Sequence, residues 1–215
     1  QRSRPALVRA AGRDRGGRPR LTPETPLELP LFPLNTVLYP GGVLPLRIFE
    51  QRYLAMTKRC LRDQTSFGVC LITEGREVGA PALPADVGCE ARIERWDMPQ
   101  LGIFQLVTRG GQRFRVLEAE TQPDGLLTGE VTLLDAEPPA PVGERHAPCV
   151  EVLRKLVEKL GEEYFPGPHP YDDASWVSYR LAELLPLELV EKQRMLVQND
   201  PVGRLDRILH LLQRG

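Results

Sequence analysis

The sequence predicts an α+β protein in which a curled β-barrel is followed by a small C-terminal α-helical bundle. Three observations support this prediction. Short runs of strand-forming residues, broken by proline and glycine, fill residues 27–137. In residues 149–215 the apolar residues instead recur at helical spacing. Residues 138–148 are rich in proline, which fits neither pattern, so we assign them to a linker and place a domain boundary there.

The first part of the barrel is predicted to consist of short extended pieces bent around turns. Prolines recur every few residues in 27–48, which excludes a continuous helix and confines strands to edges, starts or bulges. The segment YPGG at 39–42 is a turn signal, because proline presets φ and glycine accepts positive φ. The apolar residues of 50–62 then fall on or near one side of a helix, and 67–73 is an apolar run of strand length.

An antiparallel meander is predicted for residues 86–137. Its strands are runs of strand-forming residues at 87–96, 101–108, 114–119 and 126–134. Gly110 and Gly111 lie between two of these runs and are predicted to form a hairpin, since positive φ costs glycine nothing. The sequence PDG at 123–125 predicts another turn. Several strands at this spacing favour a barrel or a strongly curled sheet.

Four helices are predicted in the C-terminal half. The first has an apolar stripe over residues 150–160, with charged residues on its other face. Asp173 or Ser175 caps the second helix, which runs toward residue 185. Pro186 is predicted to begin the third. The dipeptide DP at 200–201 begins the last helix, because an aspartate N-cap followed by proline is a strong helix start.

The composition is that of a globular protein without a membrane segment. Apolar residues make up 41% of the chain and charged residues 27%, which are ordinary values for a soluble domain. No apolar run approaches the ~20 residues that a membrane-spanning helix needs. The first part of the chain lacks the hydrophobic region of a secretory signal. We therefore expect a cytoplasmic protein with no membrane partner.

The formal net charge of −1 is unevenly distributed along the chain. Residues 1–26 contain seven arginines against two acidic residues, which leaves 21 basic and 27 acidic residues in the remainder. An arm so rich in Arg, Gly and Pro buries too little apolar surface to fold, so we predict that it is disordered. Such an arm can bind RNA by counterion release. The acidic body and the lack of interleaved aromatic residues nevertheless make nucleic acid a disfavoured partner.

Residues 29–53, LPLFPLNTVLYPGGVLPLRIFEQRY, resemble the opening of the N-terminal domain of the Lon protease family. The family pattern is roughly PLFPL, a few residues, LFPG, and then LPLxIFExRY with an amphipathic helix. Only Tyr39 departs from it, where phenylalanine is usual. Further matches follow in family order: FGV at 67–69, VG at 87–88, GQRFRV at 111–116 and LAELLPL at 181–187. The resemblance spans residues 27–215.

The resemblance implies a PUA-like β-barrel joined to a helical bundle, in a module that receives protein substrates for a separate motor and protease. The motor and the protease are not expected in this chain. No Gly-Lys pair occurs, so the phosphate loop of an ATPase is missing. None of the serines lies in a glycine-rich context that would expose a nucleophile. We therefore expect a standalone, non-enzymatic form of the domain that needs no cofactor.

Two further residue patterns could indicate a catalytic site. Ser175, His169 and Asp172 or Asp173 lie close together in sequence. A Ser-His-Asp triad requires that its residues lie close together in space, which nearness in sequence does not establish. No G-x-S-x-G elbow accompanies them, so helix capping and a surface loop explain these residues better. The neighbouring carboxylates at 162–163 and 172–173 are interpreted in the same way, as residues of helix ends.

The cysteines predict no metal site. They form no C-x-x-C pair, which is the spacing that structural zinc usually needs. We expect four buried free thiols, at Cys60, Cys70, Cys89 and Cys149. His146 with Cys149 would supply only half a site, and no second pair lies nearby in the sequence.

We expect the module to bind unfolded or partly folded polypeptide, with a protease as a further partner. Exposed apolar side chains suit this function because misfolded chains offer apolar segments. Trp96, Met98 and Leu101, around Pro99 in an inter-strand loop, are the candidate residues. An alternative role for Trp96 and Met98 is to close one end of the barrel. Two other functions stay open, a PUA-like RNA-binding protein and a small-molecule-binding regulatory domain, and so does the oligomeric state.

Overall fold

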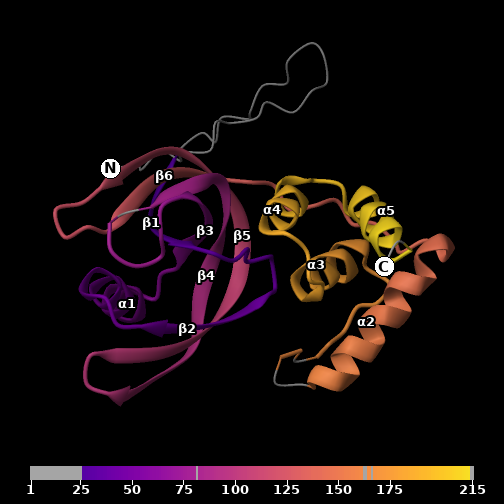
Figure 1. Cartoon of the computed structure of the whole chain (residues 1–215), viewed down its shortest axis with the longest axis horizontal. Coiled ribbons are helices and arrows are strands. Elements are labelled where there is room, and N and C mark those ends of the chain that lie inside the picture. Colours follow the sequence, from indigo (N-terminus) through magenta and orange to yellow (C-terminus); the bar gives the residue numbers. More distant parts are fainter. Residues whose placement is uncertain (1–25, 81, 162–163, 166, 214–215) are drawn as a thin grey trace, which may run out of the picture.

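The computed structural model describes residues 26–80, 82–161, 164–165 and 167–213. The strands form one half of the molecule and most of the helices form the other, so the two lie side by side (Figure 1). The predicted α+β class, a curled barrel followed by a helical bundle, is confirmed. The arm predicted at 1–26 lies, except for its last residue, outside the described residues.

Six strands and one helix build the first half. In chain order they are β1 (Leu27–Leu34), β2 (Val43–Ile48), α1 (Gln51–Asp63), β3 (Phe67–Glu74), β4 (Leu83–Gln100), β5 (Ile103–Thr121) and β6 (Leu127–Leu133). The strand order is β2-β5-β4-β3-β1-β6, and an additional β5–β6 pairing closes the sheet into a ring. β1 and β3 pair in parallel, whereas the other pairings are antiparallel. β2 stands outside the ring and pairs with β5.

The turn predicted at 39–42 is confirmed. The Gly42 N–H donates to the Tyr39 carbonyl at 2.9 Å, and Gly41 has a φ of 73°. This is the conformation for which proline followed by glycine is suited. The turn then lies against β5, because the Gly41 N–H donates to the Gly110 carbonyl and the Gly110 N–H donates to the Gly42 carbonyl, both at 2.8 Å.

The hairpin predicted at Gly110 and Gly111 is wrong. β5 runs through both glycines without a break, so the strands predicted at 101–108 and 114–119 are parts of one strand. Glycine is needed at position 110 because a Cβ atom there would lie 2.0 Å from the Tyr39 carbonyl oxygen. The glycine therefore serves the close approach of the 39–42 turn. The chain reverses instead between β4 and β5, where Gly102 has a φ of 83°.

Helix α1 supplies much of the barrel core. Its apolar side buries Tyr53, Leu54, Met56 and Cys60, as the helical periodicity predicts. The ring of Tyr53 packs on that of Phe32 in β1, with 4.0 Å between the ring centroids. Each fully buried apolar side chain of this kind contributes about 1.5–3 kcal/mol to folding.

The second half consists of a short 3₁₀ helix and four α-helices. They are η1 (Glu144–His146), α2 (Ala147–Leu160), α3 (Ala174–Leu184), α4 (Leu189–Val197) and α5 (Pro201–Leu212). The predicted caps are confirmed, since Asp173 accepts from the Ser175 N–H and Asp200 accepts from the Gly203 N–H, both at 2.9 Å. Among the described residues, no helix is long and apolar enough to span a membrane.

Pro186 does not begin the third helix, contrary to the prediction. α4 starts at Leu189, after the extended residue Glu188. Leu185, which precedes the proline, is also extended, with a ψ of 144°. Steric contact with the proline ring disfavours helical backbone in the preceding residue, so Pro186 ends α3 rather than starting α4.

The core of the helical half extends onto the barrel. Leu153, Leu181, Met195 and Leu205 are fully buried at its centre. The same cluster includes residues of the barrel half: Val37, Tyr39, Leu71, Ala85 and Val87. The Tyr39 hydroxyl donates to the Lys192 carbonyl at 2.9 Å. The two halves thus share buried contacts, and the division of the chain at residues 138–148 stays a prediction.

Candidate functional site

The outer end of the β4–β5 hairpin holds the residues that the sequence selects for polypeptide binding. The hairpin extends beyond the ring of strands at the lower left of Figure 1. Trp96 and Met98 lie on β4 and are 54% and 42% exposed, and Leu101 lies in the turn and is 92% exposed. The structure therefore presents all three side chains to solvent within one short stretch of chain. A contiguous group of exposed apolar side chains on a surface is characteristic of interaction sites.

Trp96 stands between two grooves. Its ring meets that of Phe104 edge-on, with 5.6 Å between centroids, which fixes the indole on the β5 side. A groove of about 960 Å³ lies toward α1 and β1, and a second of about 530 Å³ lies toward β2. Trp96 lines both grooves, so a ligand in either one would contact its indole.

An ion pair links the hairpin to the barrel. The Arg109 guanidinium donates to both carboxylate oxygens of Glu94, at 2.5 and 3.1 Å, across the β4–β5 pair. Another of its N–H groups donates to the Gly41 carbonyl at 3.1 Å. Arg109 therefore joins three elements at the base of the hairpin: β4, β5 and the 39–42 turn. Because Arg109 and Glu94 are partly exposed, the pair contributes more to the orientation of the hairpin than to the stability of the protein.

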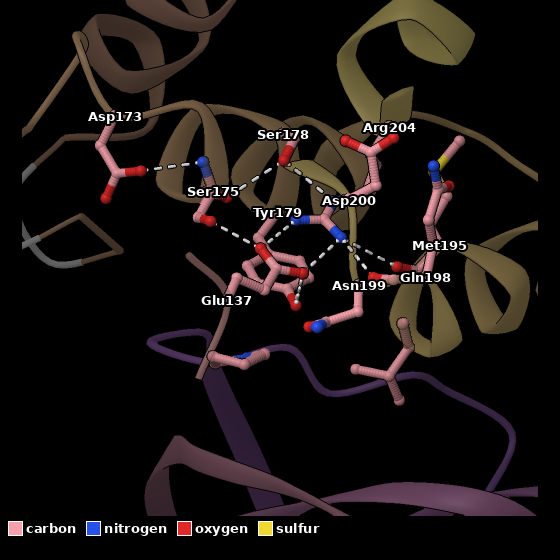
Figure 2. Close-up of polar contacts among 12 residues, drawn as sticks. Glu137, Asp173, Ser175, Ser178, Tyr179, Met195, Gln198, Asn199, Asp200 and Arg204 are labelled. Carbon is pink, nitrogen blue, oxygen red and sulfur yellow. Dashed lines mark hydrogen bonds and ion pairs between the residues drawn. The ribbon is translucent and has the colours of Figure 1, made fainter. Parts of the chain in front are cut away.

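A second polar group, shown in Figure 2, lies buried at the junction of barrel and bundle. Glu137 accepts hydrogen bonds from Ser175 Oγ at 2.6 Å, from the Tyr179 hydroxyl at 2.5 Å and from two nitrogens of Arg204 at 2.8 and 2.7 Å. Arg113 Nη1 lies 3.8 Å from the same carboxylate. Burial raises the pKa of Glu137, but the Arg204 guanidinium and the two hydroxyls outweigh it and hold that pKa below its usual value.

The two arginines also bind backbone and side-chain groups of the helical half. Arg204 is fully buried, and its Nε donates to Ser178 Oγ at 2.9 Å. Arg113 reaches from β5 to the Leu196 carbonyl at 2.9 Å and to Asn199 Oδ1 at 2.5 Å. The group thus joins β5, the segment after β6, and helices α3 and α5. Since every oxygen of Glu137 is occupied by protein donors, we interpret the group as structural.

The sequence analysis did not identify Glu137, Arg113 or Arg204. Arg113 directly precedes the strand predicted at 114–119, and Glu137 is the last residue of the predicted barrel, so neither was predicted to be a buried charge. One signal was available for Arg204. It lies on the apolar side of α5, with Leu205 and Ile208, where an arginine requires a buried acidic partner. Nothing in the sequence indicates which acid that partner is.

The structure does not bring together a Ser-His-Asp triad. Ser175 donates its hydroxyl proton to Glu137, and Asp173 is the N-cap of α3. His169 Nε2 pairs with the Phe165 carbonyl at 2.7 Å, and its ring lies near those of Tyr171 and Trp176. The carboxylates at 162–163 lie outside the described residues.

The four cysteines are free and buried, as predicted. Burial raises the pKa of the Cys70 thiol to about 12, and burial together with Asp206 raises that of Cys149 to about 11. His146 Nε2 pairs with Asp206 Oδ1 at 2.8 Å. Within residues 26–80, 82–161, 164–165 and 167–213, no three His, Cys, Asp or Glu residues lie close enough to hold a metal ion.

A ring of strands that is followed by helices defines the class of protein, the N-terminal domains of Lon proteases. The structure of a Lon N-terminal domain protein from Xanthomonas campestris superposes with a TM-score of 0.72 and 38% identity, covering 86% of this chain and 98% of that one. The N-terminal domain of the Mycobacterium avium complex Lon protease shares the fold, with a TM-score of 0.59 at 16% identity, over 86% of this chain and 97% of that domain.

The chain belongs to the Lon substrate-binding domain family. Residues 28–214 match the model of the ATP-dependent protease La (LON) substrate-binding domain. Lon protease 2 of Myxococcus xanthus is 31% identical over 212 residues, which cover 89% of this chain and 24% of that protease. The chain therefore spans about a quarter of the length of the Lon proteases that it matches.

Proposed function

We propose that this chain is a non-catalytic adaptor module that binds unfolded or partly folded polypeptide and presents it to a protease. The main observation in support is the exposure of Trp96, Met98 and Leu101 at the outer end of the β4–β5 hairpin. The family, which is described as substrate-binding, supports a polypeptide as the ligand. The described residues hold no assembled nucleophile or metal ligands that would add a chemical step.

The energetics of such a site suit a receptor that must release its ligand. A tryptophan side chain buries roughly 150–250 Å², and about half of Trp96 is available to a ligand. At about 25 cal/mol per Å², covering it contributes about 2–3 kcal/mol. Met98 and Leu101 add similar amounts, and association costs offset part of the total. The resulting affinity is moderate and depends on apolar content more than on a particular sequence.

The binding of a permanently unfolded protein tests this function. Fluorescein-labelled, reduced and carboxymethylated α-lactalbumin is titrated with the full chain, and binding is followed by fluorescence anisotropy. Combining Trp96→Ala, Met98→Ala and Leu101→Ser should weaken binding at least about tenfold, since these side chains supply the apolar contact. Circular dichroism establishes that the variant is folded.

Val190→Ser is the matched control, because Val190 is also an exposed apolar side chain but lies on α4, in the helical half. It should leave the affinity unchanged. Equal affinity of the triple variant and the wild type would contradict the proposal, and so would an effect of Val190→Ser as large as that of the triple variant.

A further inference from the structure

The outer half of β4 has a free backbone edge. β3 pairs with β4 only as far as Phe67 opposite Ala91. From Arg92 to Gln100, β4 pairs with β5, and no other strand of the described residues pairs with it. In an antiparallel strand alternate residues direct their N–H and C=O groups outward, so this edge presents unpaired donors and acceptors on either side of a register shift between Ile93 and Arg95.

A groove lies along this edge because the chain before β3 turns away. Helix α1 ends at Gln64, whose φ of 54° is left-handed, and the Thr65 N–H donates back to the Cys60 carbonyl at 3.1 Å. Residues 64–66 therefore do not extend the line of β3 alongside β4. The groove of about 960 Å³ occupies this position, between residues 90–96 of β4, the end of α1 and the start of β1.

The unshared edge of β2 is blocked. β2 pairs with β5 alone, so its second edge is also free among the described residues. Pro45 lies within β2 and lacks the N–H that an added strand would need. β4 contains no proline between Arg92 and Met98. Of these two edges, the one on β4 is therefore suited to backbone pairing.

The walls of the groove define the side chains that it would accept. Its apolar members are Leu27, Leu29, Leu61, Ile93 and Trp96. Its charged members are the acids Glu28, Asp63, Glu90 and Glu94 and the bases Arg59, Arg92. Arg62 and Arg109 neutralise Asp63 and Glu94, which leaves two acids and two bases, so the selection of a ligand rests on the apolar walls. Apolar walls beside a free strand edge suit an extended segment whose alternate side chains are apolar.

We propose that an extended polypeptide segment with alternate apolar side chains adds to Arg92–Met98 as a further strand and lies in the groove between β4, α1 and β1. This inference rests on the proposed function, because it specifies how the polypeptide ligand is held. Main-chain hydrogen bonds to β4 would recognise any sequence that becomes extended, whereas the apolar groove walls would select alternate apolar side chains. Trp96 would then contact the ligand at the outer end of the same groove.

N-methylated peptides test the backbone pairing. The probe is the fluorescein-labelled peptide KTVTFTVTK, measured with the full chain by anisotropy. Two further versions have N-methyl groups on alternate amides, one on the odd positions and the other on the even positions. Only one set of amides faces β4 in an added strand, so one version should bind at least about tenfold more weakly while the other keeps the parent affinity.

Amide hydrogen exchange, followed by NMR, locates the peptide. The amides of Arg92–Met98 that face away from β5 should exchange at least about tenfold more slowly with the peptide bound, whereas the amides of Val43–Ile48 in β2 should not change. Protection of β2 instead, or equal weakening by both N-methylated versions, would overturn the inference. A chain that self-associates through this edge would also overturn it, and sedimentation velocity without peptide would detect that state.

The two proposals fail in different ways. Failure of the unfolded α-lactalbumin to bind removes the proposed function and this inference together. Binding of that protein without binding of KTVTFTVTK, or with no difference between the N-methylated versions, removes only the inference. The Trp96→Ala variant separates the contributions further, since it retains the β4 backbone and should preserve the difference between the two N-methylated peptides.

Discussion

The outer end of the β4–β5 hairpin and the junction with the helices reverse the usual distribution of side chains. At the hairpin, Trp96 and Leu101 are apolar and exposed, whereas at the junction Glu137, Arg113 and Arg204 are charged and buried. Both regions include parts of β5. The comparison contrasts an exposed apolar surface, which we propose binds a ligand, with a buried charged group that holds two parts of the protein together.

The largest expected effect comes from breaking the buried charge pair. Arg204→Ala should lower the free energy of unfolding by about 3–5 kcal/mol, because it leaves the Glu137 carboxylate buried without its main partner. Combining Arg204→Met with Glu137→Leu should restore part of this loss, since no carboxylate is left unpaired and Arg113 keeps its bonds to the Leu196 carbonyl and Asn199. Urea denaturation measures the free energy of unfolding of both variants. A double variant as unstable as Arg204→Ala would show that the geometry of the pair, and not the unpaired charge, is what matters.

A smaller effect is expected from an added methyl group where the 39–42 turn contacts β5. Gly110→Ala should destabilise the protein by about 1–3 kcal/mol, because its Cβ would lie 2.0 Å from the Tyr39 carbonyl oxygen and force the turn away. Gly111→Ala is the matched control, since its Cβ would meet Glu90 at 3.2 Å and neither glycine has positive φ. Thermal denaturation should show little change for the control. Equal losses would indicate that β5 itself rejects side chains at both positions.

The pH dependence of stability sharpens the comparison at the junction. The pKa of Glu137 is lower in the folded protein than its usual value of 4.5, so its contribution is fully present above that pH. The contribution is lost as the pH falls below 4.5 through the folded pKa. Burial raises the pKa of Glu183, beside Arg180 and Lys192, so protonation of Glu183 favours folding and opposes this loss. Denaturation curves of Glu137→Gln should show a shallower loss of stability in acid than the wild type, and an unchanged slope would contradict the assignment.

The smallest expected effect is on stability at the hairpin. Leu101→Ser should change the free energy of unfolding by less than about 0.5 kcal/mol, because the side chain is almost wholly exposed. Trp96→Ala should cost about 1 kcal/mol through the lost contact with Phe104. Urea denaturation of both variants gives these values. A loss above about 2 kcal/mol for either one would support the alternative in which these residues close the barrel.

The elements with local signals could be predicted from the sequence. The caps at Asp173 and Asp200, the turn at 39–42 and helix α1 depend on residues within a few positions of one another, and all are confirmed. The hairpin prediction at Gly110 was wrong because glycine occurs both in turns and at close backbone contacts. Only the fold shows that the Tyr39 carbonyl lies against Gly110. Pro186 was ambiguous for a similar reason, since proline both starts and ends helices.

The arrangement of the junction could not be predicted. Glu137 and Arg204 are 67 positions apart, and Arg113 is 83 positions from the Leu196 carbonyl that it binds. Pairing of this kind depends on how the halves meet, which local patterns do not encode. The free edge of β4 was equally hidden, because it depends on β3 beginning at Phe67, opposite Ala91. Trp96, Met98 and Leu101 could be selected as candidates because they flank a loop, and their role in binding stays a prediction.

The unbroken course of β5 has a mechanical consequence. A strand rises about 3.3 Å per residue, so Ile103 and Arg113 are roughly 30 Å apart along one continuous ribbon. One end of that ribbon is anchored among helices, while β2 and β4 brace its flanks. The projecting end is therefore held by strand pairing on both flanks, so the surface that we propose for polypeptide binding would be formed before the ligand arrives. In the proposed function, the entropy cost of ordering on binding would fall mainly on the polypeptide.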